Sequence, residues 1–299
     1  MLWLIASAVV LLQARSSAVS GLDRLDAVRD ELTATELLRG GGRAELAAAQ
    51  RDFEEAHDRA DSVVLAPWSV VPLVNGNVRS AERITKAASR VAAVAAGAAA
   101  ETADVLEATP TTGAERLELL ARMEKITGKA SRQLRRIDLG PDFFLVQPLG
   151  NARERFLDRL DQLRDALKGA EALAAGARHL LEGPRRYLLL AANNAEMRAG
   201  SGMFLSVGVV TFADGTFSIG ELRPTPEFNP TAGAVMLPVE LEELWGWLKP
   251  GEEWRNLATT PRFDVTAPLA ADMWLTSTGE QVDGVLAVDA VALRALLAA

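Results

Sequence analysis

The stretch from residue 185 to 204, RRYLLLAANNAEMRAGSGMF, marks the change from helical to strand-forming sequence. Tyr187 to Ala192 is a short apolar run typical of a buried strand, and Met203 to Phe212 is a second such run. The polar segment between them carries two glycines and predicts a loop. Loops at the ends of buried strands are where α/β proteins usually keep functional residues. The stretch therefore predicts a sheet domain and the position of a candidate site.

The sequence from residue 184 onward continues as an alternation of strands and helices. Asp214 and Gly215 separate two alternating apolar runs, which is a strong hairpin signal. Because this alternation follows a long run of helices, we predict an α+β or α/β fold with a mixed sheet domain over residues 184–299. The expected elements are strands at Thr216 to Leu222 and Val282 to Val288, and helices at Pro238 to Leu248, at Phe263 to Trp274 and from Ala290 onward.

Residues 20–183 are nearly all helix-forming, with apolar residues at steps of three and four. Glycine and proline clusters mark the breaks between segments. We predict a helical bundle or stalk in which a Pro-Trp corner, within residues 66–81, joins two helices. The expected helices are Ser20 to Leu38, Arg43 to Leu65, Asn77 to Ala108, Ala114 to Arg136 and Asn151 to Leu181.

The composition argues against several classes of function. The 299 residues carry a net charge of −8, whereas nucleic-acid binding requires a clustered positive face, so we expect no nucleic-acid partner. The chain has no cysteine, which excludes disulfides, thiolate zinc sites and a cysteine nucleophile. His57 and His179 lie far apart in helical sequence, which argues against a histidine metal site. No Gly-x-Ser-x-Gly elbow follows a strand, which argues against a serine hydrolase.

The chain opens with MLWLIASAVVLL, a run without charged residues. This run is shorter than the roughly 20 apolar residues that cross a bilayer. A signal-peptide core, a core helix and the outer part of a membrane helix are the alternatives. We favour the third and expect residues 1–19 to be a membrane-anchor remnant. At the other end the chain stops inside an apolar helical pattern, so we expect the sheet domain to be truncated at its C-terminus.

Three motifs are similar to the bacterial domain-of-unknown-function family DUF4012. They are the Asn-Asn-Ala-Glu-x-Arg loop at residues 193–198, the Thr-Pro-x-Phe element at residues 260–263, and Gly-x-x-Val-Asp-Gly at residues 279–284. The resemblance implies a membrane-anchored protein of the bacterial cell envelope, with one membrane span and an extracytoplasmic body. It implies no reaction, because the family has no established one.

The first candidate binding group is the loop after the first strand. Its glycines would let the backbone approach a ligand, and Arg198 could hold a phosphate or carboxylate through two parallel hydrogen bonds. The structural alternative is that the two asparagines cap the strand end and that Glu196 pairs with Arg198. The candidate residues here are Asn193, Asn194, Glu196, Arg198 and Gly202.

Further candidates follow the later elements, and we expect them to meet the loop at one end of the sheet. Asp289 ends a strand, which is a recurring functional position, but it is equally a good N-cap for the next helix. Asp283 could hold a cation or serve as an ordinary turn residue. Arg223 and Arg262 could assist Arg198 in binding an anion.

Two functions therefore remain open. The first is an envelope protein with a binding or scaffolding role and no cofactor. The strand and helix around Asp289 also resemble, more loosely, an element of the LytR-CpsA-Psr phosphotransferases. That resemblance implies the alternative, a phosphotransferase or phosphohydrolase acting on a lipid-linked cell-wall glycopolymer intermediate. Its partner would be a polyprenyl phosphate, and a divalent cation such as Mg²⁺ would be held by Asp283 or Asp289.

Overall fold

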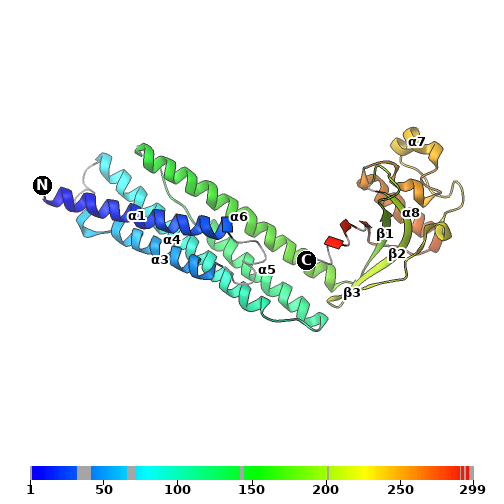
Figure 1. Cartoon of the computed structure of the whole chain (residues 1–299), viewed down its shortest axis with the longest axis horizontal. Coiled ribbons are helices and arrows are strands. Elements are labelled where there is room, and N and C mark those ends of the chain that lie inside the picture. Colours follow the sequence, from blue (N-terminus) through cyan, green and yellow to red (C-terminus); the bar gives the residue numbers. More distant parts are fainter. Residues whose placement is uncertain are drawn as a thin grey trace. The chain divides into compact units, whose positions relative to one another are not determined.

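The computed structural model describes residues 2–31, 42–65, 72–141, 145–200, 202–289, 291–292 and 294–295. The chain forms two compact units (Figure 1). The helical unit comprises residues 1–111 and 118–177, and the sheet unit comprises residues 112–117 and 178–299. The Pro-Trp dipeptide at residues 67–68 and most of the predicted final helix lie outside the described residues.

Five long helices account for most of the first 182 residues, in agreement with the predicted helical region. Within the described residues, the breaks at Thr109-Pro110 and Gly140-Pro141 fall where the sequence indicated them, whereas the glycine cluster at 40–41 and Pro67 lie outside those residues. Helices α5 and α6 contribute their first and last residues, respectively, to the sheet unit. The helices are α1 (Leu2–Glu31), α3 (Arg43–Ala60), α4 (Pro72–Leu106), α5 (Gly113–Arg135) and α6 (Gln147–Glu182).

Helix α1 joins two segments that the sequence suggested separately, the apolar opening and the helix predicted from Ser20. The apolar opening and the segment after Ser20 form one continuous helix, because no proline interrupts them and Gly21 is accommodated within it. The proposed boundary between residues 19 and 20 therefore falls inside α1. Among the helices in the described ranges, none combines the length and apolarity needed to cross a bilayer.

Small residues and short polar side chains join α1 to α3. Gly21 lies against the ring of Phe53, where an added Cβ would be 3.0 Å from the ring atoms. Ser17 Oγ donates to Glu55 Oε2 at a distance of 3.2 Å, and Arg24 Nε forms an ion pair with Asp52 Oδ2 at 2.8 Å. The core of this unit is Ala49, Phe53, Ala88 and Ala92, with Leu25 and Phe156 packed against it.

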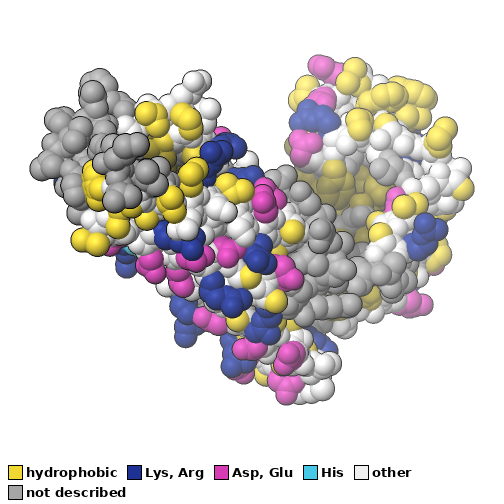
Figure 2. Space-filling view, turned by 60° about the vertical axis from the view of Figure 1, so that its left-hand side comes forward, with side chains coloured by type: hydrophobic (Ala, Val, Ile, Leu, Met, Phe, Trp, Pro, Cys, Tyr) yellow, Lys and Arg dark blue, Asp and Glu magenta, His cyan; other side chains and the backbone are white. Residues whose placement is uncertain are grey.

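Charged side chains cover the helical unit without separating by sign. On the face shown in Figure 2, Lys and Arg side chains are interspersed with Asp and Glu side chains. Some charged side chains on α6 bind other parts of the helical unit. Arg164 donates to the carbonyls of Leu134 and Ile137, at 2.9 and 3.1 Å, and so binds the C-terminal turn of α5.

The sheet is mixed, as the alternation of strands and helices predicted. Its strand order is β3-β2-β1-β5, and β4 pairs with β2. Strand β1 runs antiparallel to β2 and parallel to β5. Asp214 and Gly215 both have positive φ, at 53° and 75°, which suits the tight hairpin between β2 and β3. The strands are β1 (Arg185–Asn193), β2 (Met203–Ala213), β3 (Thr216–Ile219), β4 (Arg223–Pro224) and β5 (Gly284–Asp289).

One face of the sheet carries the core of the sheet unit. Leu188, Leu190 and Val207 are fully buried there, against Trp254, Met273 and their neighbours. The elements that contribute to this core are α7 (Val239–Trp245), α8 (Phe263–Thr278) and the 3-10 helices η2 (Thr225–Phe228) and η4 (Trp254–Thr259), and η3 (Gly246–Leu248) follows α7 without a buried residue.

Candidate functional site

The loop after β1 and the end of β5 meet at one edge of the sheet. Because these strands are parallel and pair Ala192 with Asp289, their carboxyl ends lie side by side. A hydrogen bond links the loop to the end of β5, since Asn194 Nδ2 donates to Asp289 Oδ2 at 2.7 Å. The predicted proximity of this loop to Asp289 is therefore observed.

Asp289 is engaged in local hydrogen bonds. Its Oδ1 accepts the backbone N–H of Ala292 at 2.6 Å, which is the geometry of a helix N-cap. The hydrogen bond from Asn194, together with that from Ala292, holds the pKa of the Asp289 carboxyl below its ordinary value of 3.8. The geometry is thus that of the capping alternative.

This pKa predicts how stability changes with pH. A carboxyl whose pKa is lowered by folding stabilises the native state above the unfolded-state pKa, and this contribution is lost as pH falls through the folded-state pKa. Asp289→Asn keeps a capping oxygen but cannot titrate. We expect the variant to have a lower Tm than the unmodified chain at pH 7, with the difference shrinking below about pH 4.

Thermal unfolding monitored by circular dichroism between pH 7 and pH 3 measures this difference. Asp272→Asn is the control, because Asp272 is exposed on α8 and makes no hydrogen bond or ion pair with the described residues. A Tm difference for Asp289→Asn that stays constant across this pH range would contradict the assignment.

Backbone contacts close the loop on itself. Asn193 Oδ1 accepts the N–H of Ala195 at 3.1 Å, and its carbonyl accepts the N–H of Glu196 at 3.2 Å. Gly202 has a φ of 129°, and a Cβ there would lie 2.6 Å from the Asn193 carbonyl oxygen. Only glycine fits this position without displacing the backbone. Asn193 and Gly202 therefore shape the loop.

The loop also contacts the segment before α8. Gly200 donates its N–H to the Ala258 carbonyl at 3.0 Å. Thr259 and Thr260 follow and are buried. Thr260 Oγ1 accepts the N–H of Arg262 at 3.3 Å, while Thr259 Oγ1 has no hydrogen-bond partner among the described residues. The loop and the start of α8 thus lie together, as the sequence analysis expected.

Arg198 differs from the other candidate arginines. Its Nη1 donates to the carbonyl of the adjacent Met197 at 3.1 Å, and no carboxylate in the described part of the chain pairs with it. The Glu196–Arg198 ion pair of the structural alternative is likewise not formed there. Arg198 therefore keeps a partly exposed guanidinium whose charge no described residue neutralises.

Arg223 and Arg262 are already paired. Arg262 binds Glu240 at 2.6 Å and Asp264 at 2.7 Å. The hydrogen bond with Asp264 raises the pKa of Arg262 and lowers that of Asp264. Arg223 pairs with Glu227 and lies 4.8 Å from the centre of the Phe228 ring. An anion would have to compete with these carboxylates.

Asp283 lies at the opposite end of β5 from Asp289. Strand β5 runs parallel to β1. Asp283 and Asp289 are six positions apart along it, which is about 20 Å at the rise of a β-strand. Asp283 Oδ2 accepts the N–H of Arg186 at 2.7 Å, beside the start of β1. The expectation that Asp283 meets the loop is therefore wrong, and the two aspartates cannot share a cation.

The described residues contain no group of three or more His, Asp or Glu side chains placed to hold a metal ion. Sequence reasoning missed Glu240 and Asp264 as partners of Arg262. Asp264 could have been found, because it follows Arg262 by two positions. Glu240 is 22 residues distant and has no local signal.

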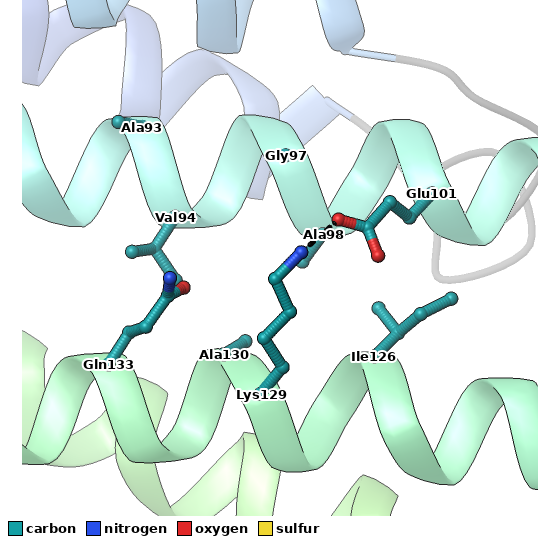
Figure 3. A pocket seen from close by; sticks show the side chains of 9 residues that line it. All are labelled: Ala93, Val94, Gly97, Ala98, Glu101, Ile126, Lys129, Ala130 and Gln133. Atoms are coloured by element: carbon teal, nitrogen blue, oxygen red, sulfur yellow. Dashed lines mark hydrogen bonds and ion pairs between the residues drawn. The ribbon is translucent and has the colours of Figure 1, made fainter.

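A shallow groove in the helical unit was also not predicted. It lies between α4 and α5, has a volume of about 180 Å³, and is crossed by an ion pair between Lys129 Nζ and Glu101 Oε1 at 2.5 Å (Figure 3). The remaining lining is small or apolar except for one glutamine. The residues of this lining are Ala93, Val94, Gly97, Ala98, Ile126, Ala130 and Gln133.

Comparison with known proteins bears on the sheet unit. Residues 182–299 match the family described as "Protein of unknown function (DUF4012)", which confirms the resemblance drawn from the motifs. No curated protein and no solved structure matches the chain.

Proposed function

Because residues 182–299 carry a DUF4012 domain, we propose that this chain is a membrane-anchored extracytoplasmic protein of the bacterial cell envelope, with a binding or scaffolding role. In this proposal a single membrane span attaches the protein and the two units lie outside the cytoplasm. The family resemblance supports the location. The contacts within the candidate site support the role.

The observation that carries the role is that four of the six charged candidates, Arg223, Arg262, Asp283 and Asp289, are used internally. Asp289 caps the turn that follows its strand, and Asp283 binds the backbone of Arg186. The guanidiniums of Arg223 and Arg262 face carboxylates. A transferase would need these groups turned toward a phosphate and a cation. Their present contacts hold the fold instead.

One observation favours the alternative, a phosphotransferase or phosphohydrolase acting on a lipid-linked cell-wall intermediate. Arg198 has no neutralising partner among the described residues and sits on a loop that contains glycine. An arginine in this setting can bind phosphate through two parallel hydrogen bonds. If Asp289 held a divalent cation such as Mg²⁺, its carboxylate would have to leave its cap.

Native mass spectrometry separates these two functions. The full-length protein would be purified in mild detergent from the membrane fraction of its own bacterium, as would Arg198→Ala. We expect membrane recovery and a mass without bound polyprenyl phosphate for both proteins. The control is Arg122→Ala, which removes an exposed arginine from α5 in the helical unit.

Each contrary result has a distinct meaning. The unmodified protein and Arg122→Ala could both bind a prenyl lipid that Arg198→Ala does not bind. That result would favour the phosphotransferase or phosphohydrolase over the scaffolding role. Recovery in the soluble fraction would instead contradict the membrane attachment.

A further inference from the structure

Four large apolar side chains project from the sheet unit around α7. Met236, Val239, Leu244 and Trp247 are 89%, 73%, 61% and 75% exposed, respectively, and together we call them the α7 tip. The same segment buries Leu241, so its apolar residues are not simply its packing face. Figure 2 shows hydrophobic side chains, with acidic and basic ones beside them, at the top of the sheet unit, where α7 is drawn in Figure 1.

Acidic residues surround the α7 tip. Glu240 precedes Leu244 by four positions and therefore lies on the same face of α7. Lys249 is the one cation between residues 236 and 253, and it pairs with Glu252 at 3.2 Å. Glu240 and Glu253 pair with Arg262 and Arg255, at 2.6 and 3.1 Å, so the net negative charge of the rim comes from Glu242 and Glu243, which form no ion pair with the described residues.

The turn that carries Trp247 is held in place. Asn256 Nδ2 donates to the Leu248 carbonyl at 2.7 Å, and the N–H of Lys249 donates to the Gly246 carbonyl at 2.9 Å. Arg262 fixes the start of α7 through Glu240. A surface that is ordered before binding loses less conformational entropy when a partner docks.

We propose that the α7 tip binds a protein partner whose surface presents an apolar stripe, such as one face of an amphipathic helix, flanked by Lys and Arg. Exposed tryptophan is one of the residues that most often anchor protein interfaces, and methionine is also enriched in them. The acidic rim selects a basic partner surface and disfavours the anionic headgroups of a membrane. This inference names the partner chemistry of the proposed binding role and rests on that role.

Fluorescence anisotropy with two labelled peptides tests the proposal. Both are amphipathic helices of about 16 residues with the same leucine stripe, flanked by Lys in one and by Glu in the other. We expect the full chain to bind the Lys peptide at least about tenfold more tightly, with affinity falling as salt is raised. Trp247→Ala should weaken this binding at least about tenfold at unchanged Tm.

Leu173→Ala is the matched control, because Leu173 is 76% exposed on α6 in the helical unit. Its binding should equal that of the unmodified chain. Equal affinity for both peptides, no measurable binding, or an unchanged affinity in Trp247→Ala would overturn the proposal.

Binding of the full chain to phosphatidylcholine vesicles tests the other kind of partner, a membrane surface. Vesicle binding that Trp247→Ala abolishes would assign the tip to a membrane surface and overturn the protein partner. A prenyl lipid lost in Arg198→Ala would instead overturn the scaffolding role itself, so the two failures are distinguishable.

Discussion

Trp254→Ala is expected to lower the free energy of unfolding by about 3–5 kcal/mol. Trp254 is 1% exposed and lies in the core of the sheet unit with Leu190 and Met273. Truncation of so large a side chain leaves a cavity that the surrounding strands and helices fill only in part. Its Nε1 also donates to the Phe228 carbonyl at 2.8 Å. That carbonyl keeps a second donor, Ser277 Oγ at 2.7 Å, so the cavity is the larger cost.

Urea unfolding of the full chain, followed by circular dichroism, measures this loss. Trp247→Ala is the matched control, because the same substitution at a 75% exposed position should change stability by no more than about 0.5 kcal/mol. Equal losses in the two variants would mean that Trp254 is not the packed core residue described above. A loss below about 1 kcal/mol for Trp254→Ala would mean the same.

The strands of the sheet unit could be predicted because their signals are local. Apolar runs mark β1 and β2, and the Asp-Gly pair marks the hairpin. The pairing of β1 with β5 could not be read in this way, since it joins Tyr187 to Gly284 across most of the domain. The 3-10 helices η2 and η4 were also missed, because short turns of this kind have no clear hydrophobic period.

The candidate site, like the sheet, was predictable only where its signals are local. The capping role of Asp289 follows from its place before a helical pattern, and the structure has that geometry. The pairing of Arg262 with Glu240 joins the residue before α8 to the first turn of α7, 22 positions away, which no local pattern encodes. The predicted position of Asp283 beside the loop was wrong because the prediction did not take the direction of β5 into account. Asp283 precedes β5 and Asp289 ends it, so they must lie at opposite ends.

The opening of the chain shows how composition and structure can divide a sequence differently. The change from apolar to charged residues suggested a boundary near residue 19. Helix geometry depends on backbone hydrogen bonds, and nothing in the sequence there breaks them. Helix α1 therefore continues to Glu31, and its second half packs on α3 through Gly21.

Phe53→Ala tests that packing and is expected to lower the free energy of unfolding by about 3–5 kcal/mol. Phe53 is 2% exposed, and its neighbours in the core are largely alanines, which cannot extend into the space that the ring leaves. The Gly21 contact adds a specific consequence. Without the ring, α1 loses its close support on α3, so its amides around Gly21 should exchange hydrogen faster than in the unmodified chain.

Hydrogen exchange measured by mass spectrometry, together with urea unfolding, distinguishes this local effect from a general loss. Leu173→Ala should leave both unchanged, because that side chain is exposed. Faster exchange in α1 and α3, with slow exchange retained in β1 and β2, would show that Phe53 supports the helical unit specifically. Unchanged exchange in α1 would contradict the packing of Gly21 on Phe53.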